Sequence, residues 1–324
     1  MVKSISKTPI TREVAAQIAG DAFCGAALLD VAECTEGWFN AVHLVTVADG
    51  RQAILKVAPP PDVTVLLYER DIMAAEVEVM RLVSDHTDVP IARVLWHDTS
   101  CTRVPSELFL MEVLPGQLLS GVRAGLSTEQ QQGIDTQVAS MLRQINALTR
   151  VGFGLAAPSA PVFDRWSAAF MHMVDDVLTD GEAAGVTLPV PPELIRAVVS
   201  DAADLLDEVT QAQLVHWDLW DGNVLVDPGS LQVTGLIDFE RALWGDPVME
   251  LQFRSAAADP AFGDAYGSRP MDAPGAHRRR LLYDLYLFVV MSVEVAYRHY
   301  PTDDMERYAR HHLDRTLRAL DLLP

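Results

Sequence analysis

The sequence predicts an α+β protein with two lobes, a small antiparallel sheet with one helix over residues 1–113 and a larger helical lobe over residues 114–324. Two observations support this prediction. Runs of β-branched residues with turn signals between them are concentrated before about residue 115. Stretches with apolar residues at helical spacing dominate after it. A length of 324 residues suits two such lobes.

Four strands and one helix are expected in the first lobe. Two apolar runs, "AVHLVTVA" (41–48) and "QAILKVA" (52–58), are rich in β-branched residues, and the "DG" between them favours a tight hairpin. A helix follows over residues 65–85, where apolar residues recur every three or four positions. Two further strands are expected at "ARVLWHD" (92–98) and "ELFLMEVL" (107–114).

Helices dominate the second lobe. Ser127 and Gln130 have the spacing of a capping box, and the helical pattern continues from there to Leu148. A proline in the first turn marks the start of another helix, "PPELIRAVVSDAADLLDEV" (191–209). The remaining helices are expected at 163–184, 278–299 and 303–322. A strand-rich lobe on a helical one predicts a cleft at the boundary, where small ligands usually bind.

The formal net charge of −20 argues against nucleic acid as a partner, because phosphates require a basic surface. An acidic surface favours a cationic partner. Acidity that serves only solubility is the simpler account of the same charge.

Neither a membrane segment nor a secretion signal is expected. Residues 1–14 lack the apolar run of a signal peptide, and the most apolar stretch, residues 281–297, contains Asp284 and Glu294 and is too short to span a bilayer. The three cysteines lack metal-ligand spacing and cannot all pair. A reducing cytoplasm is therefore the expected location.

Two Asp, one His and one Asn lie within the eight residues of "HWDLWDGN" (216–223), which apolar strand-forming residues flank on both sides. The strand after Asn223 turns at "DPG" and returns as "LIDFE", so the hairpin should bring Asp238 back close to Asn223. Together with Asp218 these side chains offer hard oxygen ligands, which suit Mg²⁺ and its bound phosphates. The competing interpretation is that they only cap turns, and the return of Asp238 across a hairpin disfavours it.

These motifs, with "GDPVMEL" (245–251), resemble the aminoglycoside phosphotransferase family, which is related to choline kinases and more distantly to protein kinases. The resemblance covers nearly the whole chain. It implies a bilobal protein-kinase-like fold and an enzyme that uses ATP or GTP with Mg²⁺ to phosphorylate a hydroxyl of a small molecule. In the implied mechanism Asn223 and Asp238 hold the metal, and Asp218 aligns the acceptor hydroxyl. His216 is expected to brace the loop.

The resemblance also assigns nucleotide contacts in the first lobe. Lys56 in "AILKVA" is similar to the strand lysine that holds the α- and β-phosphates, and Glu76 is similar to its helix partner. Glu78 lies on a different helix face. "LFLMEVLPG" (108–116) resembles the hinge between lobes, where adenine would contact the Glu112 carbonyl and the Leu114 N–H. A solvated strand lysine and an ordinary helix-surface acid are the competing interpretations.

The chain departs from the family pattern in several places. Trp217 stands where many relatives have glycine, and it either shapes the substrate pocket or packs under the loop. "DFE" replaces the "DFG" of protein kinases, so no kinase-style flipping loop is implied. The loop expected to cover the phosphates, "ECTEGWFNAV" (33–42), has one glycine, Gly37. Glu250 replaces an Asp often seen in relatives, and Asp246 fits a helix N-cap.

Two acceptor classes stay open, an antibiotic, which would make the chain a resistance enzyme, and a metabolite such as a sugar, amino sugar or amino alcohol. Asp175 and Asp176, on the helix expected to cap the acceptor site, could bind ammonium groups, but a solvated helix face explains them at least as well. A non-catalytic nucleotide-binding protein is the alternative outside enzymes, and the complete set of expected site residues argues against it. Protein-kinase activity is disfavoured because no Ala-Pro-Glu-type anchor follows Asp238.

Overall fold

The computed structural model describes residues 6–34, 37, 39–254 and 259–324, and the chain forms two compact units. The units are made of the following segments: Met1–Val65, Ala92–Leu114 and Arg298–Pro301 in the first, and Leu66–Ile91, Pro115–Tyr297 and Thr302–Pro324 in the second. The helix that was expected in the first lobe therefore belongs to the second unit. In the expected phosphate-covering loop, Thr35, Glu36 and Trp38 lie outside the described residues.

The first unit is an antiparallel five-stranded sheet with one helix, α1 (Arg12–Ala22). The strands in spatial order are β1 (Leu28–Cys34), β2 (Ala41–Val47), β3 (Gln52–Val57), β5 (Leu108–Met111) and β4 (Val94–Asp98). The expected hairpin is confirmed, because β2 pairs with β3 in antiparallel register across the turn at Asp49 and Gly50. Neither α1 nor β1 was expected.

One face of this sheet packs on α1. Leu55 and Val57 of β3 lie in the same buried cluster as Ile18 of α1. Because side chains alternate across a strand, Lys56 points to the opposite face, where it is only 5% exposed. A lysine buried on a strand between two others is not a solvated edge residue.

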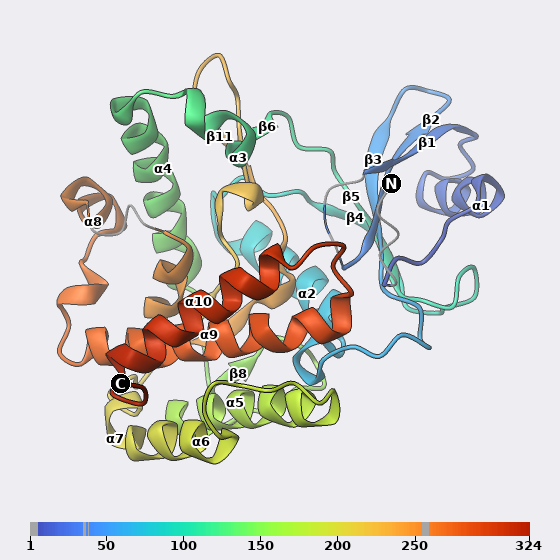
Figure 1. The fold of residues 1–324 in the computed structure, drawn as a ribbon. Helices are drawn as coiled ribbons and strands as arrows, with labels where there is room; N and C mark the ends of the chain where they lie inside the picture. Colours follow the sequence, from blue (N-terminus) through green and yellow to red (C-terminus); the bar gives the residue numbers. More distant parts are fainter. Residues whose placement is uncertain (1–5, 35–36, 38, 255–258) are drawn as a thin grey trace. The chain divides into compact units, whose positions relative to one another are not determined.

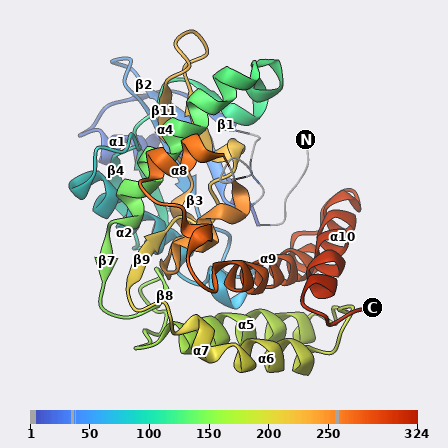
Figure 2. The ribbon, with the colours of Figure 1, turned by 90° about the vertical axis from the view of Figure 1, so that its left-hand side faces the viewer.

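Helices make up most of the second unit (Figures 1 and 2). They are α2 (Ile72–His86), α3 (Leu119–Val122), α4 (Thr128–Asn146), α5 (Trp166–Ala183), α6 (Pro192–Asp201), α7 (Ala203–Leu206), α8 (Pro260–Tyr266), α9 (Ala276–Arg298) and α10 (Asp304–Ala319). The views agree that α5 lies beside α6, and α4 packs against α8. Within the described ranges, no helix is long and apolar enough to cross a membrane.

Short strands and 3₁₀ turns connect these helices. One sheet has the order β11 (Val233–Leu236), β10 (Val224–Val226), β6 (Gln117–Leu118), and another has the order β7 (Thr149–Arg150), β9 (Ala212–Val215), β12 (Leu243–Gly245), β8 (Gly154–Leu155). The 3₁₀ turns are η1 (Leu67–Glu69), η2 (Arg123–Gly125), η3 (Asp221–Asn223), η4 (Phe239–Arg241), η5 (Pro247–Phe253) and η7 (Pro270–Asp272). The two sheets frame the polar stretch, because β9 precedes it and β10 follows it.

Two helices differ from the expected ranges. Residues 65–85 form η1 and then α2, because Asp71 has a left-handed φ of 54°, a conformation that Asp tolerates better than most residues. Residues 191–209 form α6 and α7, which are separated at Ala202. The apolar spacing correctly predicted helices in both ranges. Such spacing does not reveal where one residue, here Asp71 or Ala202, interrupts the helix.

The expected helix caps are confirmed. The Ser127 hydroxyl accepts the Gln130 N–H at 3.2 Å, and Gln130 Oε1 accepts the Ser127 N–H at 2.9 Å, which completes the capping box of α4. Asp246 caps η5 by accepting the Val248 N–H at 3.0 Å. These caps satisfy backbone donors that have no partner within the helix.

Candidate functional site

A hairpin in the second unit places Asp238 next to Asn223. Val224 of β10 pairs with Leu236 of β11. Beyond that pair, the Ile237 N–H donates to the Asn223 carbonyl at 3.1 Å. The chain therefore returns at Asp238 beside the end of the polar stretch.

His216 fastens the polar stretch to the returning strand. Its ring is fully buried, Nε2 donates to the Ile237 carbonyl at 3.0 Å, and Nδ1 accepts the Asp218 N–H at 3.3 Å. Burial lowers the pKa of His216 to about 4. The ring is then neutral near pH 7, with one nitrogen as donor and the other as acceptor. This arrangement braces the loop, the role expected for His216.

Glu250 anchors the first two residues of the loop. Its carboxylate accepts the His216 N–H at 2.5 Å and the Trp217 N–H at 3.2 Å, and it also accepts from Asn146 Nδ2 at 3.2 Å. The side chain is fully buried, and burial raises the pKa of Glu250 to about 7. The sequence identified Glu250 only as a replacement for Asp, and the structure gives it these contacts.

Asp218 and Asn223 are in direct contact. Asn223 Nδ2 donates to the Asp218 carbonyl at 2.8 Å and lies 3.3 Å from Asp218 Oδ2. Burial raises the pKa of Asp218 to about 8, the charge of Arg241 lowers it, and the charges of Asp238 and Glu240 raise it further. With this pKa, Asp218 is largely protonated at neutral pH, so it must lose its proton before it can act as a general base.

Three carboxylates lie together beside this pair. Glu76 of α2, Asp238 and Glu240 each offer an oxygen, and these oxygens lie within 4.8 Å of one another. Like charges at such separations repel, and a bound cation relieves the repulsion. Oxygen donors of this kind suit Mg²⁺. Sequence reasoning missed Glu240, although its acid in place of the "DFG" glycine was the available signal.

Arg241 belongs to the same turn, and its side chain is 17% exposed. One of its Nη atoms donates to Glu294 Oε1 at 2.6 Å, and the Tyr68 hydroxyl donates to the same oxygen. The guanidinium carbon lies 5.7 Å from the centroid of the Tyr68 ring. Arg241 was also missed, because a charged residue directly after "DFE" looks like an ordinary surface residue in sequence.

Trp217 packs under the loop. Its indole is fully buried and stacks on Tyr286 of α9, with ring centroids 5.1 Å apart and planes inclined by 18°. The indole Nε1 donates to Gln252 Oε1 at 2.7 Å. The backbone of Trp217 has a φ of 55°, a left-handed conformation that is unusual for a bulky residue. Of the two interpretations of this residue, the structure supports packing.

Lys56, Glu112 and Leu114 belong to the first unit. Lys56 is buried on β3, and the other two residues follow β5 directly. The Glu112 carboxylate accepts from Arg93 Nε at 2.9 Å. The side chain of Glu112 is therefore occupied, so only its main chain is available for the expected adenine contact.

Asp175 and Asp176 of α5 have different surroundings. Asp175 Oδ1 accepts from Arg196 Nε of α6 at 2.8 Å, and the Asp175 side chain is 46% exposed. The Asp176 side chain is 23% exposed and lies 3.6 Å from His172 Nε2. Burial raises the pKa of Asp176, and the Asp176 charge in turn raises the pKa of the buried Tyr286. Asp175 is therefore paired with Arg196, whereas Asp176 is partly buried and lies beside His172.

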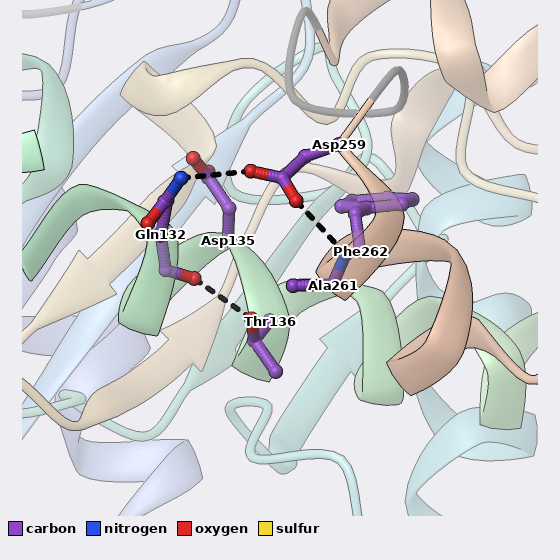
Figure 3. A pocket seen from close by; sticks show the side chains of 6 residues that line it. All are labelled: Gln132, Asp135, Thr136, Asp259, Ala261 and Phe262. Atoms are coloured by element: carbon purple, nitrogen blue, oxygen red, sulfur yellow. Dashed lines mark hydrogen bonds between the residues drawn. The ribbon is translucent and has the colours of Figure 1, made fainter. Parts of the chain in front are cut away.

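A separate small pocket lies between α4 and α8 (Figure 3). It is lined by Gln132, Asp135, Thr136, Asp259, Ala261 and Phe262. Gln132 Nε2 donates to Asp259 Oδ2 at 2.9 Å, and Asp259 Oδ1 accepts the Ala261 N–H at 2.8 Å. The six lining residues include none of the expected site residues.

The sequence matches a family model described as the phosphotransferase enzyme family over residues 30–282. The aminoglycoside 3'-phosphotransferase of Streptomyces fradiae is 40% identical over 67 residues, which cover 19% of this chain and 25% of that protein. A subtelomeric hrmA-associated cluster protein of Aspergillus fumigatus is 31% identical over 117 residues, which cover 36% of this chain and 22% of that protein. The matched stretch thus spans at most 25% of these two curated relatives.

Solved structures resemble nearly the whole chain. A protein described as a fructosamine-3-kinase, from Thermobifida fusca, has a TM-score of 0.66 at 17% identity, covering 94% of this chain and 98% of that one. The aminoglycoside phosphotransferase APH(4)-Ia, in a ternary complex with ADP and hygromycin B, has a TM-score of 0.61 at 20% identity, covering 94% of this chain and 98% of that one. Similarity at these identities shows the fold, and the predicted protein-kinase-like α+β fold is confirmed.

Proposed function

The chain belongs to the phosphotransferase enzyme family, and on that premise we propose that it moves the terminal phosphoryl group of ATP or GTP to a hydroxyl of a small molecule. The observation that supports the proposal most is the convergence of Asp218, Asn223 and Asp238 around one hairpin. Phosphoryl transfer needs positioned oxygens and charge neutralisation more than covalent help from the protein.

Asp218 is the proposed catalytic residue. It accepts a hydrogen bond from the acceptor hydroxyl, aligns that oxygen with the terminal phosphorus, and takes up the proton as transfer proceeds. Asn223 steadies the Asp218 main chain through its amide, and Arg241 partly offsets the carboxylates around Asp218. His216 and Glu250 hold the loop that carries these groups.

Asn223 and Asp238 would hold Mg²⁺, with Glu76 or Glu240 as a further oxygen donor. Bound there, the metal would neutralise charge on the nucleotide phosphates. In the first unit, Lys56 would contact the α- and β-phosphates, and the main chain at Glu112 and Leu114 would contact the base.

A hydroxylated antibiotic that carries positive charge is the proposed acceptor. The relative from Streptomyces fradiae is an aminoglycoside phosphotransferase, and a structural neighbour is described with hygromycin B. The net charge of −20 and the partly buried Asp176 favour a cation. An amino-sugar metabolite is the second candidate, because the fructosamine-3-kinase resembles the chain at a TM-score of 0.66.

The proposed location is the cytoplasm. Cys24 and Cys101 are free thiols. Thiols of this kind stay reduced in the cytoplasm, which also contains the nucleotide donors.

The test is acceptor-dependent release of ADP or GDP by the purified protein with Mg²⁺. Three acceptor groups are compared: aminoglycosides, other hydroxylated antibiotics, and amino sugars that include fructosamines. The Asp218→Asn variant is the control for contaminating kinases. Release with antibiotics alone supports a resistance enzyme, and release with amino sugars alone supports the metabolic kinase. Nucleotide binding without any acceptor-dependent release would contradict the transferase proposal and favour a non-catalytic binding protein.

A further inference from the structure

Four charged side chains form a network that contacts the polar stretch 216–223, called the catalytic loop below. They are Arg123, Asp135, Asp221 and Arg254. Arg123 donates through both Nη atoms to Asp135, at 2.7 Å and 3.1 Å, and through Nη2 to Asp221 Oδ1 at 3.1 Å. Arg254 Nη1 donates to the same Asp221 oxygen at 3.2 Å. Two arginines and two aspartates balance in charge, so the network can be buried without a net charge.

Arg254 also holds the backbone of the loop. Its Nε donates to the Leu219 carbonyl at 2.6 Å, and its side chain is only 2% exposed. The Arg254 guanidinium therefore forms hydrogen bonds with the loop at two points, the Leu219 carbonyl and the Asp221 carboxylate. Hydrogen bonds between charged groups are shorter and stronger than neutral ones and fix geometry as well as distance.

Asp221 begins the 3₁₀ turn η3, which ends at Asn223. Within this turn the Asn223 N–H donates to the Trp220 carbonyl at 2.9 Å, and the Asn223 side chain contacts Asp218. A shift of Asp221 would therefore move Asn223 relative to Asp218. On the far side, Asp135 belongs to α4, which a capping box and a buried face hold in place.

We propose that Asp221 is a positioning residue, clamped by Arg123 and Arg254 so that the turn presents Asn223 to the Mg²⁺–nucleotide. The proposal rests on the proposed function. Asp221 would have this positioning role, and Asp135 would not. Asp135 binds the same two arginines but lies on α4 and lines the pocket of Figure 3. If the network were only a stabilising ion cluster, the two aspartates would be equivalent.

The experiment compares Asp221→Asn with the matched control Asp135→Asn. The first measurement is calorimetric binding of ADP at a series of Mg²⁺ concentrations. The second is hydrogen exchange of the peptide that contains residues 219–224, without ligand. For Asp221→Asn we expect the half-saturating Mg²⁺ concentration to rise about 10- to 100-fold, the range seen when groups supporting metal ligands are removed, together with faster exchange in this peptide. For Asp135→Asn we expect a lower Tm but a Mg²⁺ requirement close to that of wild type.

An unchanged Mg²⁺ requirement in Asp221→Asn, or an equal rise in both variants, would overturn the positioning role. If Asp221→Asn does not fold because two arginines are left with one aspartate, the charge-balanced double variant Asp221→Asn/Arg123→Gln takes its place with the same expected result. Wild-type protein that binds no Mg²⁺–nucleotide would overturn the proposed function and this role with it. Wild-type protein that binds, with a variant that binds equally well, would overturn this role alone.

Discussion

Replacing Trp217 separates two opposing contributions to the stability of the catalytic loop. The indole is fully buried, stacks on Tyr286 and donates to Gln252. Its backbone, at a φ of 55°, is in the left-handed region. Truncating a buried Trp costs about 3–5 kcal/mol, whereas a left-handed backbone costs an L-residue about 1–2 kcal/mol. Packing should therefore dominate, and Trp217→Gly should lose about 1–4 kcal/mol in the free energy of unfolding, the difference between those two ranges.

The matched variant is Trp217→Ala, which removes the same indole but keeps a Cβ at a positive φ. Glycine is usually less stable than alanine, because its unfolded chain has more freedom. At this position the order should reverse, with Trp217→Gly more stable than Trp217→Ala by up to about 1 kcal/mol. A third variant, Trp217→Phe, keeps an aromatic ring against Tyr286 and removes the hydrogen bond to Gln252, at a cost of about 1 kcal/mol for the lost bond.

Urea denaturation followed by circular dichroism gives the three free-energy differences. Trp217→Gly as stable as wild type would show that the packing contributes little and that strain dominates. Trp217→Ala more stable than Trp217→Gly would show that the backbone at this position is not strained. Either result would refute the balance worked out above.

Four further measurements test the site. Asp218→Asn should lower turnover about a hundredfold or more, as for a positioned general base, with nearly unchanged nucleotide binding in calorimetry; turnover near that of wild type would remove Asp218 from this role. The same variant should gain stability relative to wild type between about pH 4 and pH 8, because the pKa of Asp218 is raised from 3.8 to about 8 and the stability tied to its protonated form is lost progressively between those two values; parallel curves of Tm against pH would contradict the raised pKa. Asp238→Ala should remove most of the Tm increase produced by Mg²⁺–ADP, and a surviving increase would mean that the metal binds elsewhere. Asp176→Asn should raise the Michaelis constant of a cationic acceptor more at low salt than at high salt, whereas the ion-paired Asp175 should tolerate the same change; equal effects of the two variants, or a neutral best acceptor, would contradict the cationic-acceptor proposal.

The elements that the sequence predicted are those whose signals are local. The hairpin of β2 and β3 and the capping box at Ser127 depend on residues a few positions apart. The missed strand β1, "LLDVAEC", has a burial pattern that does not alternate strictly. The missed helix α1 is rich in alanine and acquires its buried face only by packing on the sheet. The residue pattern within one segment cannot predict such packing, because it depends on contacts between segments.

The same distinction between local and long-range contacts applies to the residues of the site. Asp218, Asn223 and Asp238 could be grouped from the sequence because a hairpin joins them. The approach of Glu76 to Asp238 depends instead on the packing of α2 against η4, elements far apart in the chain. The family resemblance predicted that Glu76 pairs with Lys56, but it did not predict that Glu76 lies close to Asp238 and Glu240.

The charge balance around Asp218 is the feature that no short stretch of sequence contains. Burial raises the pKa of Asp218 most, the charges of Asp238, Glu240 and Glu294 raise it further, and Arg241 opposes them. These groups come from η4 and α9, so their sum appears only after the helical unit has folded. Burial and these carboxylates favour the protonated form of Asp218 in the absence of metal. A divalent cation held at Asp238, as proposed above, would add positive charge beside Asp218. The group proposed to accept a proton would then become ionised when the Mg²⁺–nucleotide binds, which links readiness for transfer to the presence of the phosphate donor.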